Sequence, residues 1–549
     1  MKKGFTLIEL LAVILILGII ALIAIPTVNN ILKEARIGAF KSSMQNIEKA
    51  AQEKCLTEKM KGNTISQFVI ADGKISPSLD IKGKIPENGV ISLDNECNAN
   101  SIITNDQYIY SSNEKENNAE ECTSTSCVFK GDIKEDDEKY KCFNFDETTG
   151  TILKYNGTEE GCKGNVYIPS KINGVPVVKI NALAFITPDQ IICKKNGVKT
   201  TYDSTYIPKD EDGECYGSGF TTRSTYSTVN LEDAGYLTSI EDNAFYYTDI
   251  QELKFNDNLK KIGYYAFSQN NIESVTLPKN LVEMEEGAFE EAGVVNLVIN
   301  NKLKIIPEYA FSFCNIPLIN IPEGVEEVDD GAFAWGNYSG GNTVINISDT
   351  VKRINYIAFM EVGAVEINFG KNVEFIGAYS FDSNLLTNIT LPTKLKTLEP
   401  AAFTNNKFPA GNDFIYNLNS DGSTNTKSLN SYGGISDSIT IPATIEELGE
   451  SSVRYAGATS ITLNNGLKYI REGALDGNNL TSITIPSTVE IIEKEGINKR
   501  NRGNQSLTTI VNKTGRSFDW SSITGSLTPN QNFETGTISH NYGNINVTK

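Results

Sequence analysis

Residues 266–289 read AFSQNNIESVTLPKNLVEMEEGAF, and this stretch decides the fold of most of the chain. It begins and ends on the pair Ala-Phe, so that Phe267 and Phe289 stand 22 residues apart. The same Ala-Phe pair recurs at this interval at three further positions, with Phe245, Phe311 and Phe333. A unit of this length buries its apolar side chains only against neighbouring units, so the units are expected to stack as a solenoid.

The period continues towards the C-terminus with two interruptions. After a four-residue insertion it resumes at Phe359, Phe381 and Phe403, and after a longer insertion near 405–430 it is held by Val453, Leu475 and Ile497. Other apolar positions keep the same register: Leu259, Leu281, Leu303 and Val325; Ile262, Met284, Ile306 and Val328; and Leu277, Ile299 and Ile321. Short alternating segments such as 274–277 predict strands that form a sheet along one face of the solenoid. We interpret the register phenylalanines as core.

This array resembles the BspA-like class of bacterial surface leucine-rich repeats over about two thirds of the chain. The segment 145–185 resembles the entry to such arrays, and an insertion near 187–235 interrupts it. The resemblance implies an extracellular solenoid that presents a surface.

The N-terminal segment, residues 1–26, reads MKKGFTLIELLAVILILGIIALIAIP. Counted from Phe5, its apolar run has about the length that a bilayer-spanning helix requires. Lys2 and Lys3 predict that the N-terminus stays cytoplasmic while the rest is exported. A secretory signal would have a shorter core and a small-residue cleavage site, whereas this run continues into Pro26 and a polar helix. A single-pass transmembrane segment is therefore predicted at about 5–26.

Glu9 is the informative residue of this segment. An unpaired carboxylate in an apolar span costs about 3 kcal/mol. If the peptide bond after Gly4 is cut, the new amino terminus at Phe5 lies one helical turn from Glu9. The ammonium of a neighbouring subunit would then neutralise the carboxylate in an apolar bundle, which makes Glu9 a candidate assembly residue.

The stretch from Lys2 to Pro26 resembles the leader and helix of type IV pilins and pseudopilins. The resemblance implies cleavage between Gly4 and Phe5 and N-methylation of Phe5 by a prepilin peptidase. It further implies a membrane-anchored subunit that assembles with other pilin subunits through the pilus machinery. Gly18 and Pro26 are carried over from related fibres as positions where the helix weakens on packing.

The cysteines predict an oxidising compartment, because eight of the nine lie between Cys55 and Cys215. A small head after the helix would be stapled by some of Cys55, Cys97, Cys122 and Cys127, with connectivity left open. Cys193 and Cys215 are a candidate pair across the first insertion, Cys142 and Cys162 are candidates in the first repeat unit, and Cys314 is expected to be a buried free thiol.

Composition excludes several classes of function. Lys and Arg number 49 against 68 Asp and Glu, a net charge of −19 that repels polyphosphate, so no nucleic-acid partner is expected. One histidine, His540, leaves no basis for a Ser-His-Asp triad or a multi-histidine metal site. Acidic runs are interpreted as solvated loops. We therefore expect no catalytic residues, no metal, no cofactor and no enzymatic activity.

Binding is expected on the insertions rather than in the repeat register. Aromatic residues surrounded by Gly, Asn and Ser suit adaptable contacts with an extracellular protein or carbohydrate. The candidates are Trp335, Tyr338, Tyr416 and Tyr432.

The predicted fold is a long N-terminal α-helix with a membrane-spanning half and an amphipathic half, a small α+β disulfide-stapled head, and a β-rich leucine-rich repeat solenoid of 22-residue units. The expected divisions are 1–4 (leader), 5–58 (helix), 59–141 (head), 142–504 (solenoid) and 505–549 (cap). The predicted function is a type IV pilin-like subunit, minor or at the tip, that presents the solenoid for adhesion. It would sit in the cell membrane before assembly and in a pilus or on the cell surface afterwards. The alternative is a pseudopilin-like or simply membrane-anchored surface protein that is not assembled into a fibre.

Overall fold

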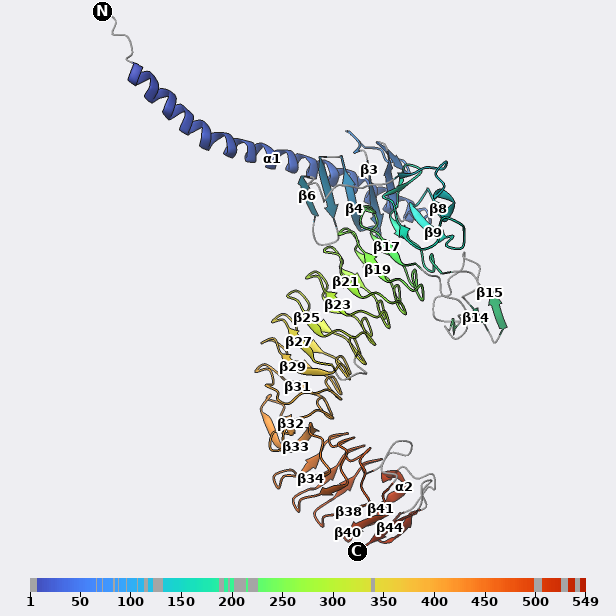
Figure 1. Ribbon diagram of the computed structural model, residues 1–549, viewed down its shortest axis with the longest axis vertical. Helices are drawn as coiled ribbons and strands as arrows, with labels where there is room; N and C mark the ends of the chain where they lie inside the picture. The colour runs from blue at the N-terminus through green and yellow to red at the C-terminus, as the bar shows by residue number, and fades with distance from the viewer. Residues whose placement is uncertain are drawn as a thin grey trace, which may run out of the picture. The chain divides into compact units, whose positions relative to one another are not determined.

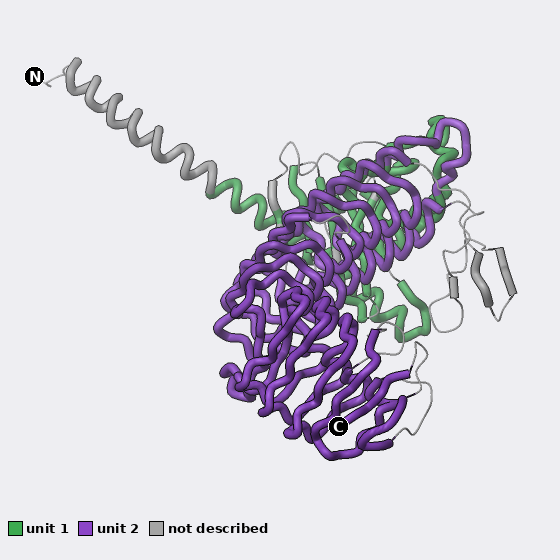
Figure 2. The backbone as a smooth tube through the Cα atoms, turned by 60° about the horizontal axis from the view of Figure 1, so that its bottom comes forward, with its two compact units in different colours: residues 1–154, 168–180, 231–238 green, residues 155–167, 181–230, 239–549 purple. Residues whose placement is uncertain are grey.

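The fold is described from a computed structural model, in which the chain divides into two compact units (Figure 2). The first comprises Met1–Lys154, Ile168–Ile180 and Leu231–Thr238, and the second Tyr155–Tyr167, Asn181–Asn230 and Ser239–Lys549. The described residues are 7–65, 67–71, 73–81, 84–86, 88–94, 96–105, 107–112, 117–121, 132–186, 192–195, 198–201, 214–215, 226–336, 341–497, 506–524, 532–538 and 544–549; the side chains of 7–30 and of the strands between 192 and 215 are not among them.

In the first unit, one long helix packs on an antiparallel sheet. Helix α1 (Leu7–Met60) has 54 residues, and its second half carries apolar residues at helical spacing. The six-stranded sheet has the order β2-β1-β3-β4-β5-β6. Its strands are β1 (Gln67–Ala71), β2 (Lys74–Ser76), β3 (Asn88–Leu93), β4 (Ala99–Thr104), β5 (Tyr108–Ser112) and β6 (Asn117–Glu121).

The core of this head lies between the helix and one face of the sheet. Phe40, Met44, Ile47 and Ala51 from α1 meet the sheet in one cluster of buried side chains. Removing these apolar surfaces from water fixes the helix on the sheet. Shorter elements complete the unit: β7 (Asp132–Ile133), η1 (Tyr140–Cys142), β8 (Phe143–Asp146), β9 (Thr151–Tyr155), β11 (Lys171–Ile172), β12 (Val175–Pro176) and β13 (Lys179–Ile180).

In the second unit, short strands repeat in two series and stack in chain order (Figure 1). The first series is β18 (Ser239–Ile240), β20 (Lys261–Ile262), β22 (Glu283–Met284), β24 (Ile305–Ile306), β26 (Glu327–Val328), β28 (Arg353–Ile354), β30 (Phe375–Ile376), β31 (Thr397–Leu398), β35 (Glu447–Leu448), β37 (Tyr469–Ile470) and β39 (Ile491–Ile492). The second is β10 (Val166–Tyr167), β17 (Thr228–Asn230), β19 (Glu252–Lys254), β21 (Ser274–Thr276), β23 (Asn296–Val298), β25 (Leu318–Ile321), β27 (Thr343–Ile347), β29 (Ala364–Asn368), β34 (Ser438–Thr440), β36 (Ser460–Thr462), β38 (Ser482–Ile485) and β40 (Thr509–Asn512). The pairing is parallel, with Lys261 opposite Glu283 and Ser438 opposite Ser460. This confirms the predicted solenoid of 22-residue turns and the predicted fold class.

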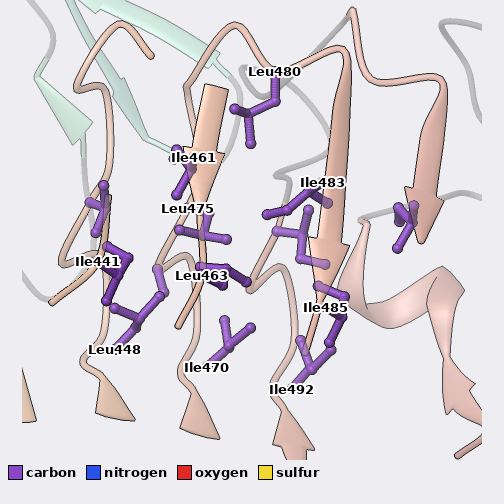
Figure 3. Packing of buried hydrophobic residues seen from close by; sticks show 14 of the residues in the cluster. Ile441, Leu448, Ile461, Leu463, Ile470, Leu475, Leu480, Ile483, Ile485 and Ile492 are labelled. Carbon is purple, nitrogen blue, oxygen red and sulfur yellow. The ribbon is translucent and has the colours of Figure 1, made fainter. Parts of the chain in front are cut away.

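The register phenylalanines form one continuous column inside the array. From Phe245 to Phe403, neighbouring rings lie 5.1–5.5 Å apart between centroids, and nearly all pairs are close to parallel. Each amide also bonds to the next turn, as when Phe267 N–H donates to the carbonyl of Ala288 at 2.9 Å. The period therefore marks core residues. Figure 3 shows how isoleucine and leucine side chains from successive turns fill the same interior further along.

A second column is polar and lies three residues after the register position. Asn270, Asn384, Asn406 and Asn478 are buried there. The Asn406 side-chain amide donates to the carbonyls of Phe381 (3.0 Å) and Phe403 (2.9 Å), and its oxygen accepts from Leu386 N–H at 3.1 Å. These bonds satisfy backbone groups at a corner that no strand pairs.

The corners also use left-handed backbone in an alternating pattern. Gly287 (φ +62°) and Gly331 (φ +59°) occupy the position two residues before the register phenylalanine. A Cβ on Gly287 would lie 2.6 Å from the ring of Tyr265, and one on Gly331 would lie 2.4 Å from the ring of Tyr309. The tyrosine of one turn therefore covers the glycine of the next.

The insertion near 405–430 is a β-hairpin. Strands β32 (Phe414–Leu418) and β33 (Thr424–Tyr432) pair antiparallel, and β33 then joins the array because Leu429 pairs in parallel with Leu448. Tyr432 N–H donates to the carbonyl of Ser452, as Val453 N–H donates to that of Ala474. The hairpin therefore contributes a turn of its own, with Tyr432 in the register position.

The array closes with an irregular segment. Strand β44 (Ile545–Thr548) pairs in parallel with β40, and β43 (Gly536–Ile538) pairs antiparallel with β44. Trp520, the first residue of α2 (Trp520–Ile523), is fully buried and its indole N–H donates to the carbonyl of Phe533 at 2.8 Å. The remaining strands are β41 (Phe518–Asp519) and β42 (Asn532–Phe533), and β14 (Ile192–Lys195), β15 (Val198–Thr201) and β16 (Glu214–Cys215) in the first insertion.

Candidate functional site

The predicted processing and assembly residues fall at the edge of what the structure describes. Gly4 and Phe5 lie outside the described residues, and Glu9, Gly18 and Pro26 lie in the part of α1 for which the backbone alone is described. Where side chains are described, no helix is both long and apolar enough to cross a bilayer. The predicted membrane-spanning segment at about 5–26 lies outside those side chains.

A carboxylate that the sequence did not single out organises the head. Glu48 on α1 accepts hydrogen bonds from Ser101 Oγ at 2.6 Å, from Tyr110 Oη at 2.7 Å and from Ser112 Oγ. All three donors are buried, on strands β4 and β5. Burial, together with the negative charge of Glu48, raises the pKa of Tyr110 well above its usual value, so its phenol stays a donor.

A disulfide joins the same helix to the connection between β3 and β4. Cys55 in α1 is bonded to Cys97, 42 residues away, with 5.9 Å between their Cα atoms. This confirms a disulfide-stapled head. Cys142 and Cys162 are also disulfide-bonded.

Of the remaining cysteines in predicted pairs, the structure describes two by their backbone and leaves two undescribed. Cys193 and Cys215 are register partners on β14 and β16, and their bond stays a prediction. Cys122 and Cys127 lie outside the described residues. Cys314 is a buried free thiol in the place of the column asparagines, where its sulfur contacts the carbonyl oxygen of Phe289 at 3.3 Å. Burial raises the pKa of this thiol to about 11.

The four aromatic binding candidates have different surroundings. Trp335 is half-buried, and its ring stacks with those of Phe313 (5.1 Å) and Tyr309 (6.1 Å). Tyr416 is half-buried and packs against the core of the last turns. Tyr338 lies outside the described residues, as does His540.

Tyr432 requires a correction. Its side chain is 3% exposed and lies 5.2 Å from the ring of Phe414. Because it occupies the register position of its turn, its ring belongs to the core and is not offered to a ligand.

A polar pocket of about 220 Å³ lies beside this hairpin, within the second unit. The hairpin provides Asn417 and Asn430, and the following turns provide Arg471 and three carboxylates. The sequence did not predict this site because its residues come from segments that lie far apart along the chain. Among the described residues, no three His, Cys, Asp or Glu side chains gather as a metal site.

Two carboxyl groups elsewhere in the array have raised pKa values. Burial raises the pKa of Asp382 to about 6, although the hydroxyls of Thr404 and Ser383 donate to it. Burial, reinforced by Glu291, raises the pKa of Glu290 to about 7. Asp382 is buried in the array and Glu290 is half-buried. Neither residue lines the pocket beside the hairpin.

Comparison with known proteins follows the two parts of the chain. The model of the BspA type leucine rich repeat region matches residues 220–339, 337–431 and 430–515, together more than half of the chain. The prokaryotic N-terminal methylation motif matches residues 1–25, which implies processing by a prepilin peptidase. The type IV major fimbrial protein FimA of Dichelobacter nodosus is 35% identical over 112 residues, which are 19% of this chain and 69% of that protein.

Two solved structures are similar to this chain over about two thirds of its length. A leucine-rich repeat protein from Bacteroides ovatus is 19% identical and covers 67% of this chain and 86% of its own, with a TM-score of 0.37. A leucine rich cell surface protein from Faecalibacterium prausnitzii is 17% identical and covers 68% and 87%, with a TM-score of 0.36.

The matched families are ones whose members are typically not enzymes. A pilin-like N-terminus is here fused to a surface repeat domain. The chain belongs to the BspA-type leucine-rich repeat family through its array and to the type IV fimbrial proteins through its N-terminal part.

Proposed function

We propose that this protein is a minor or tip subunit of a type IV pilus-like fibre and that its array mediates adhesion. One observation carries the proposal: an N-terminal methylation motif and a surface repeat array stand in a single chain. The helix assembles with other subunits, and the repeats present a surface to an extracellular protein or carbohydrate.

The bulk of the array favours a minor or tip position. With strands about 4.8 Å apart, a dozen turns extend over roughly 55 Å. An array of that size on every subunit would not fit around a fibre whose helices pack closely.

Processing and assembly follow from the first residues. Cleavage after Gly4 frees an amino terminus at Phe5, which becomes N-methylated. Inside the fibre, Glu9 meets the ammonium of a neighbouring subunit, since neither charge is stable alone in an apolar bundle. Gly18 and Pro26 let the helix loosen as it packs.

N-terminal sequencing and intact mass of the native protein test this proposal, with fibre and membrane fractions kept separate. A chain that begins at methylated Phe5 in the fibre fraction is expected. The same chain found in membranes alone would favour a pseudopilin-like part, and an uncut Met1 would defeat the pilin-like proposal.

The second candidate is a surface protein that is anchored in the membrane and never enters a fibre. Glu9→Gln discriminates between the two. It should abolish incorporation into fibres if Glu9 is an assembly residue, and it should leave the surface display of a simple anchor unchanged.

A further inference from the structure

We propose that the polar pocket beside the β32–β33 hairpin binds one neutral hexose unit of a glycan, an inference that rests on the proposed role of the array in adhesion. The pocket has a volume of about 220 Å³ and is lined by Asn417, Asn430, Glu447, Glu450, Arg471 and Glu493, together with the backbone at Pro400 and Gly449. All of these residues belong to the second unit.

The pocket exists because one corner of the array, between the strand and the register residue of the hairpin turn, is shorter than the others. Between strand and register residue, a regular turn counts five residues, as from Leu448 to Val453, whereas the hairpin turn counts three, from Leu429 to Tyr432. The corner therefore lacks two residues. The hollow left between Pro400 of the turn before and Gly449 of the turn after is the pocket.

A contact across the same corner supports this origin. Tyr379 Oη donates to Ser451 Oγ at 2.7 Å, although the two residues are 72 positions apart. Elsewhere in the array, side-chain bonds between turns join residues about 22 apart, such as Lys302 to Asn280. A long side chain thus spans the gap, while the pocket beside it stays open.

The lining is held rigidly by its own hydrogen bonds. Arg471 lies between two carboxylates, with Nη1 2.7 Å from Glu493 Oε1, and with Nε and Nη2 each 3.2 Å from Glu447 carboxylate oxygens. Its guanidinium also lies 5.2 Å from the ring centroid of Tyr469. A site whose side chains are already fixed loses little conformational entropy when a ligand binds.

The amides are equally fixed. Asn430 Nδ2 donates to Asn417 Oδ1 at 2.9 Å and to the carbonyl of Glu399 at 2.8 Å, and Asn417 Nδ2 donates to Ser428 Oγ at 2.7 Å. The pocket therefore combines fixed planar donors and acceptors. Each hydroxyl of a sugar ring is both a donor and an acceptor, so it can donate to a carboxylate oxygen of the lining and accept from a guanidinium N–H of Arg471.

The charges select against anionic ligands. Three carboxylates face one guanidinium, and the salt bridges to Glu447 and Glu493 hold the pKa of Arg471 above its ordinary value. A phosphate, sulfate or sugar acid would meet net negative charge and a cation that is already paired. A neutral sugar meets no such penalty.

The ligand is expected to bind by polar contacts alone. Tyr416 packs against the core while its neighbour Asn417 lines the pocket, at a point where the pairing of β32 with β33 shifts register. No aromatic side chain is among the lining residues.

The test uses the full chain, purified in detergent and titrated with methyl glycosides of glucose, galactose and mannose by saturation-transfer NMR. At least one neutral sugar should bind to the wild type. Arg471→Gln and Glu493→Gln should each weaken that binding at least tenfold.

Arg353→Gln is the matched control. Arg353 lies 3.4 Å from Glu327 and 4.0 Å over the ring of Phe375, an environment like that of Arg471 but away from the pocket. Its binding should equal that of the wild type, and all three variants should keep the thermal unfolding midpoint of the wild type within a few degrees.

Three outcomes would overturn the proposal: no binding of any of the three sugars at millimolar concentration, unchanged binding in both pocket variants, or preferential binding of glucuronic or sialic acid. Cell adhesion is measured separately, so the two proposals can fail independently. If cells adhere equally well without the protein but the sugar titrations give the expected result, the adhesion proposal is refuted and the pocket proposal is supported. If adhesion requires the protein but neither Arg471→Gln nor Glu493→Gln changes sugar binding, the pocket proposal is refuted and the adhesion proposal is supported.

Discussion

At the scale of single residues, Glu48 shows what a sequence pattern leaves open. The helical spacing of Phe40, Met44 and Ile47 predicts a buried face, and that face packs on the sheet. Glu48 stands beside it with no motif around it. Its three hydroxyl partners lie 53 to 64 residues further along the chain, so no local pattern could assign them.

Glu48→Ala is expected to loosen the head. It removes the hydrogen bonds that Ser101, Tyr110 and Ser112 donate to the carboxylate, and such a loss at buried donors costs about 1–3 kcal/mol in unfolding free energy. Amide hydrogen exchange in β4 and β5 should accelerate strongly. Glu53→Ala is the control, because Glu53 lies on the same helix with 70% of its side chain exposed and should leave exchange unchanged. Equal exchange in both variants would show that the bonds to Glu48 contribute nothing.

The asparagine column allows a second comparison between equivalent positions. Asn406→Ala deprives two register carbonyls and one amide of their partner, with an expected loss of about 2–4 kcal/mol in unfolding free energy. Cys314→Ala removes one weak sulfur contact from the same position in another turn and should cost clearly less. Urea unfolding of both variants checks the order, and a reversed order would contradict it.

At the scale of elements, the array was predictable to the extent that its turns are equal. Each turn repeats one set of contacts, so the Ala-Phe pair marks the core wherever the 22-residue count holds. The hairpin lengthens the interval from Phe403 to Tyr432 to 29 residues and shortens the corner before Tyr432 by two residues. The 22-residue count therefore does not predict that Tyr432 lies in the core. The pocket was not predicted either, because its lining comes from corners of several turns and the sequence does not show that these corners lie side by side.

The buried carboxyl groups of the array give its stability a pH dependence. The folded-state pKa of Asp382 is about 6, above the ordinary value of 3.8. Between these values the folded chain holds a proton that the unfolded chain releases, so stability falls as pH rises from about 4 to 6. The thermal midpoint should therefore be higher near pH 4.5 than near pH 6.5 once the other carboxylates are accounted for by comparison with Asp382→Asn.

Asp382→Asn should flatten this part of the profile. The amide keeps a similar shape and cannot ionise, so the difference between wild type and variant should grow through that window and then level off. Asp421→Asn is the control, because Asp421 is exposed on the hairpin and its pKa is lowered by its bonds to Ser423. A parallel shift of both profiles would contradict the assignment.

At the scale of the whole molecule, a stack of parallel strands needs an end that does not recruit further strands. Here β44 and β43 continue the sheet and reverse its direction, and Trp520 fills the interior behind them. Under the proposed function, an array that associated with other copies of itself would compete with assembly through the N-terminal part.

Trp520→Ala is expected to open that end. Removing a fully buried Trp costs about 3–5 kcal/mol, and fraying of β40 and β38 would expose strand edges. Light scattering should detect self-association at concentrations where the wild type stays dispersed. Phe518→Ala is the control, since Phe518 is half-buried and its ring lies 5.3 Å from that of Trp520. Self-association of both variants to the same degree would show that Trp520 has no special role.

The equal turns also determine how the array responds to tension. The bonds between turns run along the stacking direction, so a pull on the two ends detaches turns one at a time from an end. Each detached turn of 22 residues frees roughly 70 Å of chain, where the folded turn occupied about 4.8 Å. The array would lengthen stepwise and recoil when released. The head would resist the same load, because the disulfide between Cys55 and Cys97 joins its helix covalently to the connection between β3 and β4.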